Sequence, residues 1–354
     1  MTPPPPTRRP ATTPGGQASP GSVPGPPSGG PEAPDHPSLR GRGGGRAGDR
    51  VFLGLSRGAG ILLLIVIAAI AGFLLYRGIN AIKVDQGNFL TTAGWDPNGL
   101  KPVFGVAALV VGTVLSSIVA MVIAVPVGVG VALFISHYAP RRLAQLLGWV
   151  VDLLAAVPSV VYGLWGTLFL VPKMMGIHTW LGSYLGWVPV FNQSQPGAYP
   201  RTLFTAGVVL AIMVLPIITA MSREVFLQTP RAHEEAALAL GATRWEMIRT
   251  AVLPFGRPGV ISGSMLALGR ALGETMAVAM VISQGFNVTL HLLDPGTSTT
   301  IAANIANGFG EASRPVGVDA LIASGLVLFV ITLIVNGIAR WIVARRKEFA
   351  GSAA

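Results

Sequence analysis

The sequence contains no cysteine and few charged residues, and both absences narrow the possible functions. Without cysteine the 354-residue chain can form neither disulfides nor thiolate metal sites, and its five histidines lack the spacing of metal ligands. Only 11% of the residues are charged, whereas about a quarter are charged in soluble domains. Hydrophobic residues make up 51% of the chain, and the mean hydropathy is +0.61. The composition predicts a membrane protein.

Motifs for binding nucleotides are also missing. No segment fits G-x4-G-K-[ST], so the chain is not expected to hold ATP through that motif. Gly128 and Gly130 lie within an apolar segment rather than after a soluble strand, which argues against a dinucleotide site. We therefore expect no cofactor or metal on this chain and no enzymatic activity of its own.

The amino-terminal region lacks large apolar side chains. Residues 1–50 hold 13 of the 28 prolines, so they cannot bury enough surface to offset their chain entropy. We expect residues 1–57 to form a disordered, basic, Pro- and Gly-rich cytoplasmic tail. Its arginines are expected to be solvated, with contact to anionic lipid or RNA as the alternative. No apolar stretch precedes Ile61, so a first span at 58–76 is expected to act as an uncleaved anchor.

Six segments are long and apolar enough to cross a bilayer, which requires about 20 residues per helix. The sequence thus predicts an all-α membrane protein with six transmembrane helices, five of them in a core at 103–347. Asp152 is expected inside the third span, with Pro126 and Pro158 kinking their helices. The predicted spans are Gly58–Tyr76, Val103–Ser136, Leu143–Val171, Thr202–Met221, Gly259–Ser283 and Ala320–Val343.

The distribution of Lys and Arg predicts the orientation. With a cytoplasmic amino terminus, 18 of the 25 Lys and Arg residues flank the inner side and six flank the outer side. Both termini are then cytoplasmic, in a multi-pass protein of the bacterial plasma (inner) membrane. The pI near 10.8 follows from this topology. No nucleic-acid partner is needed to explain it.

A charged segment at 223–258 separates the fourth and fifth spans. Thr229 and Pro230 favour a helix start, and Gly241 can end that helix. Thr243 and Glu246 have the spacing of a capping box that opens a second helix, which is expected to run toward Leu253 before Pro254 disfavours its continuation. The segment is predicted to be a cytoplasmic hairpin of two short helices.

The first helix of this hairpin combines small and acidic residues. Glu234, Glu235, Ala236 and Ala237 present a surface suited to a groove on a partner protein. The alternative is an amphipathic loop on the lipid headgroups. It is less favoured because headgroup binding scales with apolar area, which is small here.

These residues carry a resemblance to a known family. Glu235, Ala236, Ala237, Gly241, Leu253 and Pro254 are similar to the E-A-A-x3-G-x9-I-x-L-P signature of importer-type ABC transporter permeases, with Ala251 at the usual isoleucine. In that family the loop is a coupling helix that fits a cleft on a cytoplasmic ATPase. The resemblance implies this role for 231–241, with ATP and Mg on the partner chain.

Two further stretches narrow the resemblance. "RALGETMAV" at Arg270–Val278 and "PSVVYGLWG" at Pro158–Gly166 resemble the PstC family of phosphate-importer permeases rather than its PstA partner. The resemblance implies a heterodimer with a PstA-like permease, a dimer of PstB-like ATPases and a PstS-like phosphate-binding protein outside. Inorganic phosphate and membrane lipid are the remaining expected partners.

Arg270 and Glu274 lie four residues apart in the predicted fifth span, hence on one face of a helix. A charge in hydrocarbon costs at least ~2.5 to 3.5 kcal/mol, so both should face the interior. We expect Arg270 to bind the anion through its planar fork and Glu274 to moderate that attraction. The alternative is an ion pair that only joins helices.

Two other functions remain open at this point. A permease for molybdate, sulfate or another oxyanion would share the hairpin. An ion-driven secondary carrier could instead use Arg270 and Glu274 as a relay.

Overall fold

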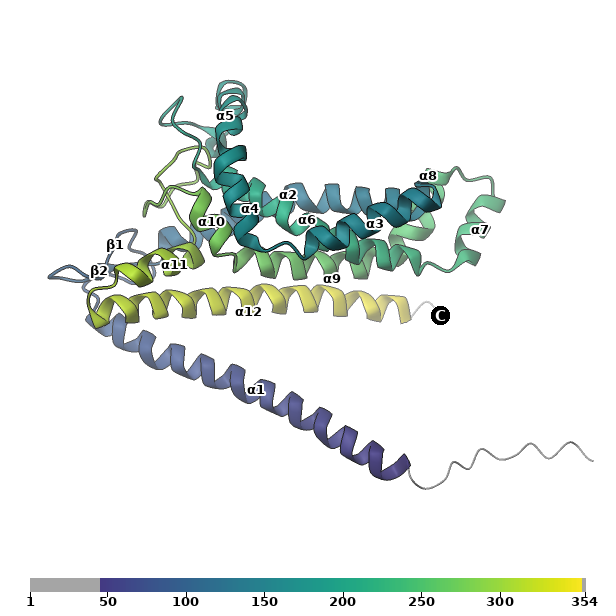
Figure 1. Cartoon of the computed structure of the whole chain (residues 1–354), viewed down its shortest axis with the longest axis horizontal. Coiled ribbons are helices and arrows are strands. Elements are labelled where there is room, and N and C mark those ends of the chain that lie inside the picture. The colour runs from purple at the N-terminus through teal and green to yellow at the C-terminus, as the bar shows by residue number, and fades with distance from the viewer. Residues whose placement is uncertain (1–44, 352–354) are drawn as a thin grey trace, which may run out of the picture. The chain divides into compact units, whose positions relative to one another are not determined.

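The computed structural model describes the backbone of residues 45–351 and the side chains of residues 48–341, and residues 1–44 of the predicted tail at 1–57 lie outside this range. The described chain is mostly helical, which confirms the all-α prediction (Figure 1). The first helix, α1, spans Gly45–Val84, so residues 45–57 are helical although the sequence placed them in the tail. A short antiparallel pair, β1 (Trp95–Asp96) and β2 (Val103–Phe104), follows.

Six helical segments in the described range are long and apolar enough to span a membrane, as predicted. They include α1, α2 (Ala107–Leu133) with the π-helical turn η1 (Phe134–Tyr138), α6 (Leu203–Leu227) and α12 (Pro315–Gly351). The third is built from α4 (Ser159–Trp165), η2 (Gly166–Leu170) and α5 (Val171–Leu185). The fifth is built from α8 (Arg244–Met247), η4 (Ile248–Val252) and α9 (Leu253–Leu272).

The third span lies later in the chain than predicted. Residues 141–155 form a separate helix, α3 (Arg141–Ala155), and the chain breaks before Pro158, whose backbone is extended. Proline supplies no N–H to continue a helix, so the apolar run divides here instead of kinking. The carbonyl of Leu154, near the end of α3, also accepts a hydrogen bond from the Tyr162 hydroxyl at 2.9 Å. Asp152, expected inside the membrane, is exposed on α3.

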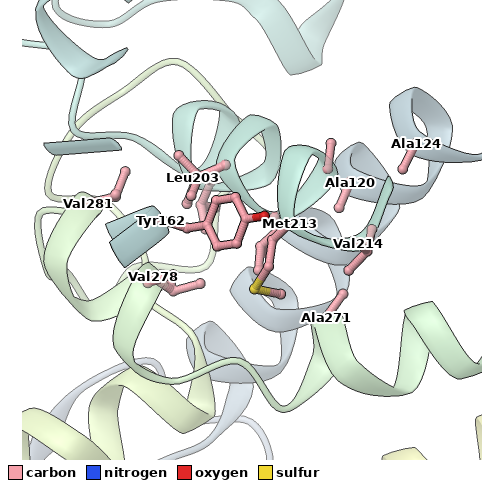
Figure 2. Close-up of a cluster of buried hydrophobic side chains, with 14 of the residues drawn as sticks. Ala120, Ala124, Tyr162, Leu203, Met213, Val214, Ala271, Val278 and Val281 are labelled. Carbon is pink, nitrogen blue, oxygen red and sulfur yellow. The ribbon is translucent and has the colours of Figure 1, made fainter. Parts of the chain in front are cut away.

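Small residues allow α6 to pack closely against α2 and α9. Gly128 of α2 faces Ile218 of α6, where a Cβ atom would meet the Ile218 side chain at 2.9 Å. The buried cluster around these helices also holds Tyr162 of α4, Met213 of α6 and Val278 of α10 (Met276–Val281) (Figure 2). Close helix approach through small residues is the usual mode of packing in lipid. It places α6 at the centre of the bundle.

The two ends of the bundle carry different elements. At one end Ser283 N–H donates to Arg201 just before α6, and Ile301 N–H, opening α11 (Ile301–Glu311), donates to Thr113 near the start of α2. The charged hairpin follows the other end of α6 (Figure 1). A 25-residue helix is about 37 Å long, enough to separate these ends by a membrane thickness.

Gly259 and Gly269 of α9 differ in their surroundings and provide a matched test of this packing. A Cβ atom on Gly259 would collide with Val225 of α6, whereas one on Gly269 would meet nothing within 4 Å. We predict that Gly259→Ala lowers stability by about 1–3 kcal/mol because the helices must separate. Gly269→Ala should be neutral or stabilise by up to about 1 kcal/mol. Thermal unfolding of the two variants in detergent measures this, and equal melting temperatures would contradict the packing.

Candidate coupling hairpin and membrane pathway

The hairpin consists of α7 (Arg231–Ala239) and α8, joined at Gly241. Gly241 has φ = +83°, a conformation that L side chains adopt at a cost of roughly 1–2 kcal/mol, so glycine ends the first helix as predicted. The Thr243 hydroxyl accepts from Glu246 N–H at 3.3 Å, and the Glu246 carboxylate accepts from Thr243 N–H at 2.8 Å. The capping box read from the sequence is therefore present. Thr229, expected to cap α7, makes no cap there, and Pro230 occupies the cap position instead.

The second helix does not stop near Pro254, which corrects the sequence-based expectation. It continues through the π-helical turn η4 into α9, with Pro254 in the first turn of α9. A π turn has a different hydrogen-bond register, so a proline directly after it can be accommodated without breaking the helix. The second helix of the hairpin and the fifth span are thus one continuous helix from Arg244 to Leu272.

Two residues of α7 and one of α9 hold the hairpin against the end of the bundle. Glu234 lies 3.5 Å from the His137 imidazole at the end of η1. Ala237 and Leu253 pack against a buried cluster that includes Leu133, Phe226 and Ile248. Two of the residues read as a coupling surface therefore also anchor the hairpin, and Glu234 has a partner that sequence spacing could not reveal.

The opposite side of the hairpin is open. Glu235 and Ala236 are exposed, and no residue of α7 is buried. Leu240 and Trp245 have exposed fractions of 90% and 56%. Trp245 is not among the sequence-predicted site residues, although a tryptophan within a capping box in a polar segment is a recognisable signal. The exposed side of the hairpin thus combines a carboxylate, small residues and large apolar side chains.

Arg270 and Glu274 do not share one helical face, because α9 ends between them. The helix ends at Leu272, and Glu274 lies in a break before α10. There Glu274 is buried, and its carboxylate accepts a hydrogen bond from Ala277 N–H at 3.1 Å. No ion pair joins Glu274 to Arg270 among the described residues. Neither the predicted common face nor the alternative ion pair is present.

Arg270 belongs to an open face of α9. Ser262, Leu266 and Arg270 recur every four residues and are exposed, while Gly263, Ala267 and Ala271 recur one position later and are buried. The helix therefore packs the stripe of small residues against the rest of this chain and leaves the stripe that contains Arg270 exposed. An arginine facing hydrocarbon would cost about 2.5–3.5 kcal/mol, so this second stripe requires water or another protein chain beside it.

The short helix after the break, α10, is held in place by Arg201, which the sequence alone places only among the charges flanking the spans. The Arg201 guanidinium donates to the carbonyls of Met280 at 2.8 Å and of Val281 at 3.3 Å. The Thr167 hydroxyl also donates to Met280, at 2.9 Å. These donors satisfy carbonyls at the carboxyl end of α10 that have no partner within the helix. The short helix after the break is thereby fixed to the main bundle.

The hairpin and Arg270 lie at the two ends of α9. Seventeen residues separate Leu253 from Arg270, which corresponds to about 25 Å along a helix. The sequence-predicted coupling and pathway residues thus lie at two separate sites, connected by a single helix.

Comparisons with known proteins identify the family. The model of the family described as "Binding-protein-dependent transport system inner membrane component" matches residues 124–348. The chain belongs to this family. Its hairpin and the whole of α9 fall within the matched region.

Similar proteins with curated names are permeases of phosphate transport systems. "Phosphate transport system permease protein PstC 2" of Mycobacterium tuberculosis is 48% identical over 298 residues, covering 83% of this chain and 91% of that protein. The PstC protein of Mycobacterium leprae is 48% identical over 271 residues, covering 76% and 84%. That of Mesorhizobium japonicum is 40% identical over 299 residues, covering 84% and 90%. The resemblance to PstC-type permeases is confirmed.

Gly241 offers a direct test of the hairpin geometry. Gly241→Ala keeps the residue small but should destabilise the left-handed turn by about 1–2 kcal/mol. We expect backbone amides of α7 and α8 to exchange hydrogen roughly five- to thirtyfold faster. Gly176→Ala in α5, where a Cβ atom meets nothing within 4 Å and φ is not positive, is the control. Unchanged exchange in the Gly241 variant would show that the turn does not hold the hairpin.

Proposed function

We propose that this chain is the membrane-spanning permease subunit of an ATP-driven phosphate importer. It forms the translocation pathway with a PstA-like permease, receives phosphate from a PstS-like binding protein and is driven by a PstB-like ATPase dimer. The permease family and the PstC relatives support the importer class. Phosphate as cargo is supported by the names of those relatives and by the chemistry of Arg270.

The observation that carries the proposal is the exposed face of α9 bearing Arg270. A charged residue in a spanning helix needs a polar surrounding, and a second permease subunit would enclose a water-filled path along this face. An arginine there offsets the desolvation of a phosphate anion and donates paired hydrogen bonds to its oxygens. Glu274 would then act by capping α10 rather than by contacting the anion.

The coupling role rests on the open side of the hairpin. Glu235, Ala236, Leu240 and Trp245 present a small exposed surface on the hairpin, whose second helix, α8, continues into α9. An ATPase that binds this surface would move α9 and thereby change which side of the membrane the pathway opens toward. ATP and Mg would reside on that partner.

Arg270→Gln tests the pathway. Because a charge-assisted hydrogen bond contributes about 1.5–3 kcal/mol, phosphate uptake at subsaturating phosphate should fall by roughly 10- to 100-fold. The measurement is labelled-phosphate uptake by membrane vesicles containing the complete transporter. Leu266→Gln, one turn away on the same face, introduces the same side chain without removing a charge and should retain most uptake.

Undiminished uptake by Arg270→Gln would remove this residue from the mechanism. Competition by unlabelled sulfate or molybdate equal to that by phosphate would instead assign another oxyanion. Uptake by the purified chain in liposomes under an ion gradient, without an ATPase, would favour a secondary carrier.

Glu235→Lys tests the coupling contact. The side chain is exposed and forms no hydrogen bond or ion pair within the described chain, so the variant should fold and insert normally. Reversing its charge at a partner interface should reduce co-purification of the ATPase by about tenfold or more. Glu224→Lys, on α6 just before the hairpin, is an exposed charge-reversal control. Equal recovery of the ATPase with both variants would count against the contact.

A further inference from the structure

A basic cavity lies beside the hairpin and is not part of the pathway. It has a volume of about 300 Å³ and is formed by η1, the first turns of α3 and the last turns of α6. Because η1 and the end of α6 terminate two spanning helices, the cavity lies at a membrane–water boundary. Its lining residues are Ile135, Ser136, Ala139, Arg141, Ala144, Gln145, Arg223 and Leu227.

Two arginines of the lining have no acceptor in the described chain. Neither Arg141 nor Arg223 forms a hydrogen bond or an ion pair with another described residue. The lining contains no carboxylate that could neutralise them. The nearby carboxylate of Glu224 accepts from Gln228, and that of Glu234 faces His137. The cavity therefore carries two uncompensated positive charges.

The position of Arg223 is built into the packing of α3 on α6. Its guanidinium rests on Gly148, a buried residue of α3, where a Cβ atom would collide with a guanidinium nitrogen. A side chain held against backbone loses less freedom on binding a ligand than one in solvent. The planar guanidinium, with its donors in a fixed fork, suits a tetrahedral oxyanion better than a point charge does.

An apolar surface adjoins this charged cavity. On α3, Leu146, Trp149 and Leu153 follow at helical spacing and have exposed fractions of 59%, 72% and 59%. A helix with such a face at a membrane boundary lies against acyl chains. A ligand with a phosphate group and hydrocarbon tails would thus meet complementary surfaces on both sides of α3. Basic pockets between membrane helices are suited to anionic headgroups for this reason.

We propose that this cavity binds a phosphate group, presented by an anionic phospholipid, through Arg141 and Arg223. The bound headgroup would join α3 to the end of α6 next to the coupling hairpin. This site is independent of the pathway at Arg270 and of the identity of the transported anion.

The test is native mass spectrometry of the full chain, purified and delipidated in detergent, during titration with phosphatidylglycerol. We expect Arg141→Gln and Arg223→Gln each to weaken binding about fivefold, since each basic residue near a lipid surface contributes about 1 kcal/mol. Arg142→Gln, an exposed neighbour on α3 outside the cavity, is the matched control and should bind within about twofold of the parent chain. Size-exclusion profiles and melting temperatures establish that the variants are folded.

Two additional arms identify the source of the phosphate group. Phosphatidylcholine should bind at least about fivefold more weakly than phosphatidylglycerol, and millimolar inorganic phosphate should not displace the lipid. Displacement by inorganic phosphate that requires Arg223 would support the phosphate-group site but assign the free anion as its ligand. Equal binding by the three glutamine variants, or equal binding of the two lipids, would overturn the proposal.

Discussion

The structure depends on the unbroken helix that runs from Arg244 to Leu272. A spanning segment must satisfy its backbone hydrogen bonds internally. Two prolines in this helix, Pro254 and Pro258, each remove a backbone N–H donor. The π-helical turn before Pro254 keeps the helix continuous. Gly256, Gly259 and Gly263 then bring it against Phe226, Val225 and Met221 of α6. In the proposed mechanism, a displacement at the hairpin would therefore be carried along α9 rather than absorbed by a flexible joint.

At its other end, α9 is followed by a break in the helix instead of a continuous segment. The helix stops at Leu272, and the buried carboxylate of Glu274 begins α10 as a separate unit. Arg201 fixes the far end of α10 to the bundle. A shift of α9 would thus be concentrated at the break next to Arg270. This arrangement links a polar surface outside the membrane to a charged residue inside it, across about 25 Å of helix.

The local features of the hairpin were predictable from sequence because they depend on neighbours in the chain. The capping box and the glycine turn follow from residues three or four positions apart, and the structure confirms both. The same is true of the number of spanning segments, which depends on apolar length alone. The contact of His137 with Glu234 joins residues almost a hundred positions apart, so no local sequence pattern predicts it.

The sequence-based predictions were wrong mainly where an apolar run contains a proline, because a proline can either interrupt a helix or be accommodated within it. The run from Leu143 to Val171 is long enough for one span, but the break before Pro158 leaves residues 141–155 as a separate helix, and the spanning segment is Ser159–Leu185. Pro254 had the opposite outcome, since the preceding π turn accommodates it. Arg270 and Glu274 were assigned to one face by spacing, which holds only while the helix is continuous. The break between them falls at Gly273, the C-cap of α9, and the Glu274 carboxylate accepts from Ala277 N–H of the next helix instead of facing Arg270.

The central claim, that α9 carries motion of the hairpin to Arg270 as a rigid element, can be measured directly. The chain has no cysteine, so Arg249→Cys in η4 and Leu266→Cys on the open face of α9 would be its only two spin-labelling sites. Pulsed electron resonance on the assembled transporter, with a cysteine-free ATPase and binding protein, gives the distance between the two labels. The account predicts one unchanged distance distribution in nucleotide-free and ATP-trapped complexes. A nucleotide-dependent shift or a second distance would show that the helix bends at η4 and would contradict it.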